Sequence, residues 1–304
     1  MATKETLTCA PVALFVYNRL WHTQRTVEAL VLNKLADQTD LYVFSDGPRS
    51  AAERSKVTDV RNFVKTITGF KSVRLIESDG NRGLANSVIN GVTKVLESHD
   101  RIIVLEDDMI TSPGFLEYMN TSLGLYEHDD RVISIHGYVY PVKRPLPPTF
   151  FLKGADCWGW ATWKRGWALF EPDGKKLLIE LKEGKLCSEF DFNNSYPYTR
   201  MLKNQIAGRN DSWAIRWYAS AFLRQKLTLY PGISLVKNIG NDSSGTHSWD
   251  NERYDHDELA QSIKVEKLTP EENLSAKEMI SDYLRATTPS LLRKTVQKIK
   301  SLIR

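Results

Sequence analysis

The segment Arg101-Ile-Ile-Val-Leu-Glu-Asp-Asp108 gives the clearest indication of the fold of this chain. Its aliphatic run, Ile102 to Leu105, is too short for a confident helix and rich in β-branched side chains, which favours a buried strand of a parallel sheet. Glu106, Asp107 and Asp108 are therefore expected at the carboxyl end of a strand, the edge at which open α/β sheets bind ligands.

Three adjacent carboxylates repel one another, and a cation is the simplest way to keep them together. The sharper hypothesis is a carboxylate pair that holds Mg²⁺ or Mn²⁺ against a diphosphate, and the alternative is a solvated acidic turn. Ser112 and Pro113 predict the next helix, with Ser112 as N-cap and Pro113 at the first helical position.

Strands and helices alternate on both sides of this stretch. Further strands are expected at Pro11–Tyr17, Leu41–Ser45, Val73–Glu77 and Val132–His136, with shorter ones at Leu227–Tyr230 and Ile233–Val236. Helices are expected at about 23–34, 51–68, 84–96 and 113–126. This alternation predicts an α/β fold with a doubly wound, mostly parallel sheet.

Polar residues follow each of the first four strands. They are Asn18 and Arg19, then Asp46 with Gly47, then Asp79 to Arg82, then Glu106 to Asp108. Such endings in register indicate one nucleotide site. The chain has no Gly-x-Gly-x-x-Gly and no Gly-x-x-x-x-Gly-Lys-Ser/Thr sequence, so a dinucleotide-binding or P-loop interpretation lacks its phosphate loop.

The composition is that of an ordinary globular protein. The chain has 304 residues, 41% hydrophobic and 26% charged, with a net charge of +4. No apolar run is long enough for a membrane span, and no signal-peptide core follows Met1. The three cysteines match neither a disulfide framework nor a zinc signature, so we expect a cytoplasmic location.

The last twenty residues, Arg285 to Arg304, contain six basic residues and no acidic one. Leu292, Val296, Ile299 and Ile303 recur among them at helical spacing. This basic amphipathic helix either lies on the inner face of the cytoplasmic membrane or docks on the domain. A basic stripe is absent elsewhere, so nucleic-acid binding is not expected.

Four tryptophans fall between Trp158 and Trp167. Tryptophan rings stack on sugars, so an acceptor platform is one interpretation, and a hydrophobic core is the other. The core is favoured for Trp163 and Trp167, which are four residues apart on an expected helix. Both interpretations remain open for Trp158 and Trp160.

Asn210-Asp-Ser-Trp213 predicts the start of another helix, with Asp211 or Ser212 as its N-cap. Asp211 could instead be a general base that faces the ligand crevice. Further along, the polar segment from Asn238 to His247 contains glycine and could close over a ligand.

These motifs together resemble glycosyltransferases of the GT-A fold, over roughly Val12 to Ser248. Val104 to Phe115 resembles the metal-binding Asp-x-Asp segment, and more closely the Glu-Asp-Asp version of the Golgi protein N-acetylglucosaminyltransferases. Asp79 to Gly91 is similar to a helix start in bacterial family 2 glycosyltransferases. The segments Cys157–Trp163 and Asp211–Trp213 follow in the same order as their counterparts.

The resemblance implies a role for each matched residue. Asp108 and His247 would bind Mn²⁺ or Mg²⁺, and Asp211 would deprotonate the acceptor hydroxyl. Arg19 and Asp46 would meet the nucleotide, Asp46 by accepting a hydrogen bond from uracil. The remaining donor-site residues would be Asn18, Gly47, Asn81, Arg82, Gly83, Glu106 and Asp107, and the acceptor-site residues would be Trp158, Gly159 and Trp160.

The resemblance therefore predicts a metal-dependent inverting transfer of a hexose or N-acetylhexosamine from a UDP-sugar to a glycan or lipid-linked saccharide, in bacterial surface polysaccharide synthesis. Residues 1–148 would form the donor half, 149–255 the acceptor half of the same domain, and 256–304 a helical extension. A sugar nucleotidyltransferase and a catalytically silent carbohydrate-binding protein are the alternatives. A sugar nucleotidyltransferase is expected to show a Gly-rich, basic signature after its first strand, and this chain has none there. A silent carbohydrate-binding protein would require loss of Asp108 or Asp211.

Overall fold

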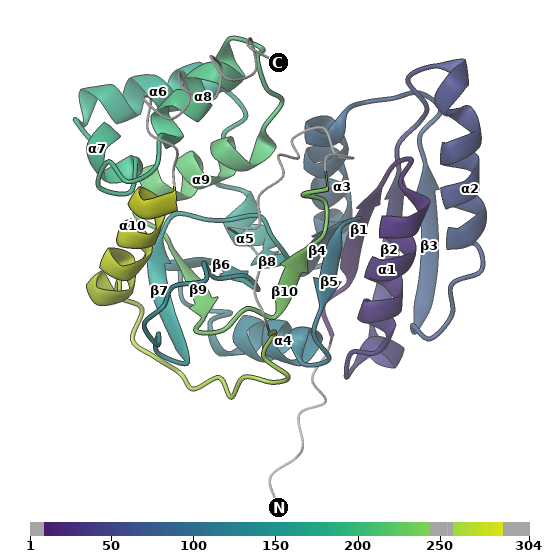
Figure 1. Cartoon of the computed structure of the whole chain (residues 1–304), viewed down its shortest axis with the longest axis horizontal. Coiled ribbons are helices and arrows are strands. Elements are labelled where there is room, and N and C mark those ends of the chain that lie inside the picture. Colours follow the sequence, from purple (N-terminus) through teal and green to yellow (C-terminus); the bar gives the residue numbers. More distant parts are fainter. Residues whose placement is uncertain (1–8, 243–253, 255–257, 288–304) are drawn as a thin grey trace, which may run out of the picture.

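A single eight-stranded sheet forms the centre of the molecule in this computed structural model, which describes residues 9–242, 254 and 258–287 (Figure 1). The strand order is β3-β2-β1-β4-β8-β6-β9-β7. All strands except β8 and β7 share one direction. The expected mostly parallel α/β sheet with flanking helices is confirmed, and it is consistent with the GT-A fold class. The strands are β1 (Val12–Val16), β2 (Asp40–Ser45), β3 (Ser72–Glu77), β4 (Arg101–Glu106), β6 (Val132–His136), β7 (Thr149–Lys153), β8 (Trp160–Trp163) and β9 (Leu227–Pro231).

Strand β1 shows how helices cover both faces of this sheet. Val12, Leu14 and Val16 pack with α1, α2 and α4, whereas Ala13 and Phe15 pack with α3. Both sets are buried because successive side chains of a strand point to opposite faces. The helices are α1 (Leu20–Val31), α2 (Arg54–Val64), α3 (Leu84–Ser98), α4 (Phe115–Leu125), α5 (Lys164–Trp167), α6 (Gly174–Glu183), α7 (Cys187–Phe190), α8 (Tyr198–Ile206), α9 (Trp213–Leu223) and α10 (Leu274–Thr287), with short 3₁₀ turns η1 (Ala36–Gln38) and η2 (Ala51–Glu53).

The helix predicted to start at Ser112 and Pro113 begins later, which corrects the sequence interpretation. Residues 109–111 form strand β5 (Met109–Thr111), which pairs antiparallel with β10 (Val236–Asn238). The Ser112 N–H donates to the Leu235 carbonyl at 2.8 Å and extends this pairing. Helix α4 therefore starts at Phe115 with Gly114 as N-cap, because the strand pairing keeps the preceding residues extended.

The β5–β10 pair lies beside the carboxyl end of β4. The late strand predicted at Ile233–Val236 is found at β10 instead. It pairs with β5, which begins directly after Asp108. The chain leaving β10 therefore passes beside the end of β4, more than a hundred residues away in the sequence.

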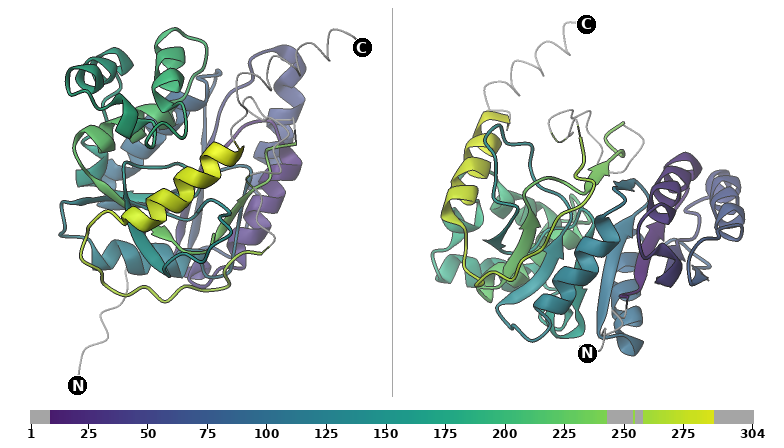
Figure 2. Two further views of the ribbon diagram at one scale, coloured as in Figure 1. Left: turned by 60° about the vertical axis from the view of Figure 1, so that its left-hand side comes forward. Right: turned by 90° about the horizontal axis from the view of Figure 1, so that it is seen from below.

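The donor and acceptor halves expected from the sequence share this one sheet. Strand β6, from the first half, lies between β8 and β9 of the second. Helix α10 packs at the other end of the molecule from α1 and α2, against residues such as Phe150 and Leu152 of β7 (Figure 2). Most of the basic tail, residues 288–304, lies outside the described residues. Within the described residues, no helix has the length and apolarity to cross a membrane, and Cys9, Cys157 and Cys187 form no disulfide with one another.

Candidate active site

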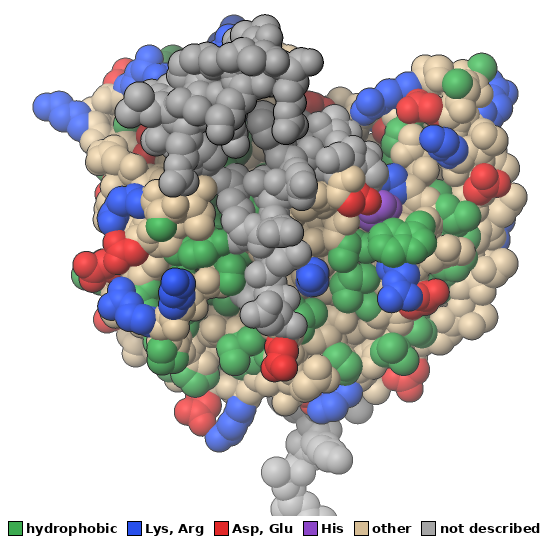
Figure 3. Space-filling model, in the orientation of Figure 1, with side chains coloured by type: hydrophobic (Ala, Val, Ile, Leu, Met, Phe, Trp, Pro, Cys, Tyr) green, Lys and Arg blue, Asp and Glu red, His purple; other side chains and the backbone are tan. Residues whose placement is uncertain are grey.

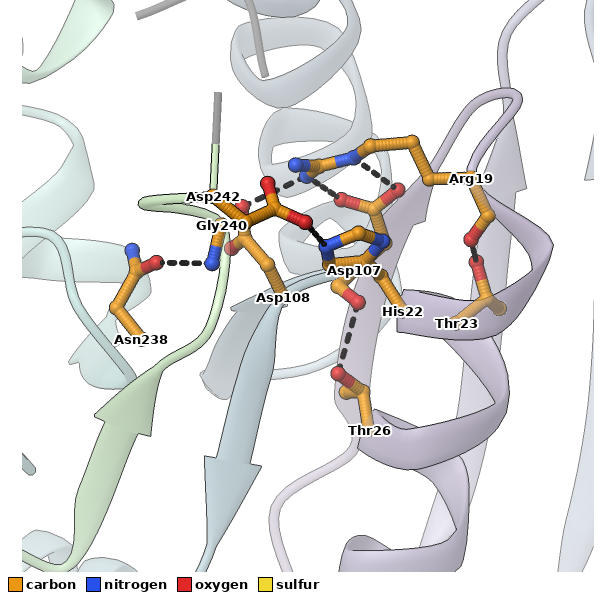
Figure 4. Close-up of polar contacts among 9 residues, drawn as sticks. All are labelled: Arg19, His22, Thr23, Thr26, Asp107, Asp108, Asn238, Gly240 and Asp242. Carbon is orange, nitrogen blue, oxygen red and sulfur yellow. Dashed lines mark hydrogen bonds and ion pairs between the residues drawn. The ribbon is translucent and has the colours of Figure 1, made fainter. Parts of the chain in front are cut away.

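Two of the three consecutive carboxylates, Asp107 and Asp108, are buried at the end of β4 and share one arginine (Figure 4). Arg19 Nη2 donates to Asp107 Oδ1, and it also donates to Asp108 Oδ2 at 2.7 Å. Arg19 Nε lies 3.3 Å from Asp107 Oδ2. Because β1 and β4 are parallel neighbours, this pairing joins residues 88 apart in the sequence.

The electrostatics of this cluster follow from its burial. Burial raises the pKa of Glu106, and the charges of Asp108 and Asp107 raise it further. Burial also raises the pKa of Asp107, while Arg19 opposes that shift. Burial would lower the pKa of Arg19, but the two aspartates outweigh it and hold that pKa above its usual value. The guanidinium therefore stays charged and compensates part of the acidic cluster.

The metal prediction can be tested against the hydrogen bonds of Asp108. Its Oδ1 atom is buried and has no hydrogen-bond partner among the described residues, and Arg19 Nη1 is in the same situation. A buried carboxylate oxygen without a partner is costly, and a hard cation prefers such a ligand. Asp108 therefore fits a divalent ion, although no three His, Cys, Asp or Glu side chains of the described residues form a metal cluster. His247, the other expected ligand, lies outside the described residues.

The segment that follows β10 covers this cluster. The Ile239 N–H donates to the Asp108 carbonyl at 2.9 Å. A Cβ on Gly240 would lie 2.1 Å from Asp108 Oδ2, so only glycine allows the backbone this close. Asp242 Oδ2 lies 3.1 Å from His22 Nε2 of α1 (Figure 4). Gly240 and Asp242 belong to the polar segment from Asn238 that was expected to close over a ligand, whereas His22 was not identified from the sequence.

Asp46, at the end of β2, is also buried, but both of its carboxylate oxygens accept hydrogen bonds from backbone N–H groups. It accepts from the Arg82 N–H at 2.9 and 3.1 Å, from the Gly83 N–H at 3.0 Å and from the Gly47 N–H at 2.9 Å. Asp46 thus holds the start of α3, where a negative charge is favourable. The contact with uracil stays a prediction, and the Arg82 side chain is exposed.

The turns after β2 and β3 meet closely. A Cβ on Gly47 would lie 2.5 Å from the backbone of Gly80, so the glycine permits the approach. Asn81 Nδ2 donates to the Gly47 carbonyl at 2.9 Å. On the other side, Asn18 Nδ2 lies 3.4 Å from Glu53 Oε1, which joins the end of β1 to η2. The structure therefore brings the donor-site residues expected at the ends of β1, β2 and β3 to one edge of the sheet.

Asp211, two residues before α9 begins, lies beside Gly83 at this edge of the sheet. Ser212 is the N-cap, since its Oγ accepts from the Ile215 N–H at 3.2 Å, and this leaves the exposed Asp211 carboxylate out of the cap. Asp211 Oδ2 lies 3.3 Å from the position that a Cβ on Gly83 would take. The Trp213 side chain slightly opposes the rise in the pKa of Glu106, which relates the start of α9 to the acidic trio.

Trp160, expected at the acceptor platform or in the core, belongs to the core. Its side chain is fully buried, with ring centroids at 5.4 Å from Trp213, 5.7 Å from Trp217 and 5.8 Å from Trp167. It has no surface left on which a sugar could stack. The predicted core positions of Trp163 and Trp167 are confirmed, since both are buried. The helix expected to carry both is corrected: Trp163 ends strand β8, and only Trp167 lies on α5.

Trp158 is only partly buried, so part of its side chain remains at the surface. Its ring meets Tyr138 and Tyr254 edge to face, with centroids 4.8 and 5.5 Å apart. The backbone N–H of Trp158 donates to His136 Nε2 at 3.1 Å. Gly159 has φ +60° and packs against Val236 of β10, which fixes this turn. Tyr138 and Tyr254 were not identified from the sequence.

Trp21 is a further aromatic residue near this edge, and its side chain is 57% exposed. Its ring meets that of His22 edge to face at 5.0 Å. Figure 3 shows hydrophobic side chains exposed over α1. Leu32, which directly follows α1, is also exposed.

No protein-family model matches the chain, and neither does any curated protein. Among solved structures, the chain is similar to a mannosyltransferase from Pyrobaculum calidifontis in complex with GDP-Man and Mn²⁺. The TM-score is 0.38 and the identity 12%, over 72% of this chain and 70% of that one. We therefore base the function on the site itself.

Proposed function

We propose that this protein is a metal-dependent glycosyltransferase that moves a sugar from a sugar nucleotide to a saccharide acceptor. One observation carries the proposal: the buried Asp108 has an oxygen without a partner, at a sheet edge that also holds Arg19 and the start of α3. Open α/β sheets bind nucleotides at this edge. An unsatisfied carboxylate there is suited to a cation that accompanies a diphosphate.

The division of work among the residues follows from their surroundings. Asp108, with Asp107 beside it, would hold the metal, and Arg19 would contact the diphosphate, since a guanidinium matches phosphate oxygens. Asp211 is exposed and takes no part in the cap of α9, so its carboxylate is available as a base. Trp158 would contact the acceptor.

We infer an inverting transfer from these roles. The acceptor hydroxyl attacks the anomeric carbon as the bond to the diphosphate breaks, and its proton passes to Asp211. The leaving nucleoside diphosphate takes the bonding electron pair. A bound divalent cation would neutralise the charge that develops on it. No nucleophilic side chain is required, because displacement occurs in one step.

We further propose UDP as the nucleotide and a glycan or lipid-linked saccharide of a bacterial surface polysaccharide as the acceptor. A hexose or N-acetylhexosamine would be transferred, and the basic residues from Arg285 onward would hold the enzyme at an anionic membrane surface. The motif resemblance and the charge of the tail support this finer assignment.

Thermal unfolding tests the proposal. The full chain is heated with UDP, GDP, CDP or dTDP, each with Mn²⁺ and then with EDTA, because a ligand that binds only the folded state raises the melting temperature. A Mn²⁺-dependent rise with UDP alone is expected. A rise with another nucleotide would replace UDP as the donor, and no rise with any would contradict the proposed transferase. UDP-sugar hydrolysis without an acceptor then separates an enzyme from a silent binding protein.

A further inference from the structure

Arg19 contacts both of the carboxylates that are proposed to hold the metal. Its Nη2 atom contacts both Asp107 and Asp108, at 2.7 Å from Asp108 Oδ2. The same oxygen lies against the Gly240 backbone, with no room for a Cβ. Asp108 Oδ1 is thus the oxygen left without a partner among the described residues. A cation that binds it would lie close to the positive charge of Arg19.

A divalent ion that binds alone must therefore approach a guanidinium that is itself largely buried, with 17% of its side chain exposed. Poor screening in such a place makes the repulsion between the two cations strong. A diphosphate removes the conflict, because its oxygens accept from the guanidinium fork and also ligate the metal.

We propose that Arg19 is an internal counter-cation which makes metal binding depend on the nucleotide: the site takes the divalent ion and the nucleoside diphosphate together and binds the free ion weakly. The proposal rests on the proposed function for the identity of the diphosphate. The opposite role is that Arg19 holds Asp107 and Asp108 in the geometry the metal needs. The two roles predict opposite effects when the charge is removed.

Calorimetric titration of the full chain with Mn²⁺ alone separates these roles. Arg19→Gln removes the charge and is expected to bind Mn²⁺ alone about tenfold more tightly than the wild type, a coupling of ordinary size. Arg19→Lys keeps the charge and is expected to stay close to the wild type. Unchanged or weaker Mn²⁺ binding by Arg19→Gln would overturn the proposal, as would tight binding by Arg19→Lys.

Arg61 provides a matched control. Its side chain is also 17% exposed, but it pairs with Glu77 and donates to the Ser45 side chain and the Ser78 carbonyl, away from the acidic trio. Arg61→Gln should leave the Mn²⁺ affinity unchanged. A tenfold change in this control would mean that charge removal anywhere alters the affinity, and the inference about Arg19 would fail.

A second titration adds saturating UDP. The wild type should then bind Mn²⁺ much more tightly, and Arg19→Gln should gain far less from UDP, because linkage requires the two ligands to share one coupling. If no variant binds UDP while Arg19→Gln still binds Mn²⁺ more tightly, the proposed function fails and the counter-cation role stands. If Mn²⁺ binds no variant at all, the counter-cation role fails.

Discussion

Asp46 and Asp108 have the same exposure, 8%, and both follow strands of the same sheet, yet their surroundings differ. Asp46 accepts hydrogen bonds from backbone N–H groups at the start of α3 with both oxygens. Asp108 shares Arg19 through one oxygen and leaves the other without a partner among the described residues.

This difference separates a carboxylate that builds the site from one that is available to a ligand. A buried carboxylate whose bonds are complete stabilises the fold, whereas an incomplete one costs stability until a ligand binds. Burial alone, or position at a strand end, would have assigned the same role to both residues.

Asp211 extends the comparison to an exposed carboxylate and carries the largest expected effect. Asp211→Asn should lower the transfer rate by about 10²–10⁴-fold, the usual contribution of a general base, and leave Mn²⁺-dependent UDP binding intact. Initial rates with a UDP-sugar and thermal shifts measure the two quantities. Ser212→Ala is the neighbouring control: it should cost about 1 kcal/mol of stability and keep transfer. Strong transfer by Asp211→Asn would remove Asp211 as the base.

Asp108→Asn tests the open carboxylate directly. The amide keeps the shape but loses the charge that attracts a cation, so the rise in melting temperature caused by UDP with Mn²⁺ over UDP with EDTA should disappear. Without ligands the variant should be about as stable as the wild type, because Asp107 still pairs with Arg19 and the repulsion between the two aspartates is removed. A retained Mn²⁺-dependent rise would contradict the metal role of Asp108.

Asp46→Asn is the reciprocal substitution at the completed carboxylate. An amide cannot accept all the backbone hydrogen bonds of the charged group, so the free energy of unfolding should fall by about 1–3 kcal/mol. The difference between UDP with Mn²⁺ and UDP with EDTA should keep its sign. Denaturant titration gives the stability, and an unchanged midpoint would show that the bonds of Asp46 contribute little.

Asp242→Asn should have the smallest effect. The Asp242 side chain is 46% exposed where it meets His22, and such pairs contribute less than about 1 kcal/mol. Denaturant titration should therefore find nearly unchanged stability. A loss of several kcal/mol would show that the segment after β10 depends on this contact more than its exposure indicates.

Some features of the site could be predicted from short stretches of sequence. The run before Glu106 identified β4, and polar residues after successive strands indicated one ligand edge, because parallel strands end together. The four tryptophans were harder, since a ring on a strand beside a glycine can face either way, and Trp160 turned out to be in the core. The helix start predicted at Ser112 was wrong, because the pairing of β5 with β10 keeps the residues before α4 extended.

The strand–helix alternation, the acidic trio and its place at the end of β4 could all be predicted from the linear pattern of residues. The partners of each carboxylate became visible only in three dimensions: Asp46 accepts from the start of α3, Asp107 and Asp108 pair with Arg19, and Asp211 takes no part in a helix cap. The physical reason is that hydrophobic periodicity acts within a few residues. Hydrogen-bond partners 36 to 89 residues apart are set instead by strand order and register.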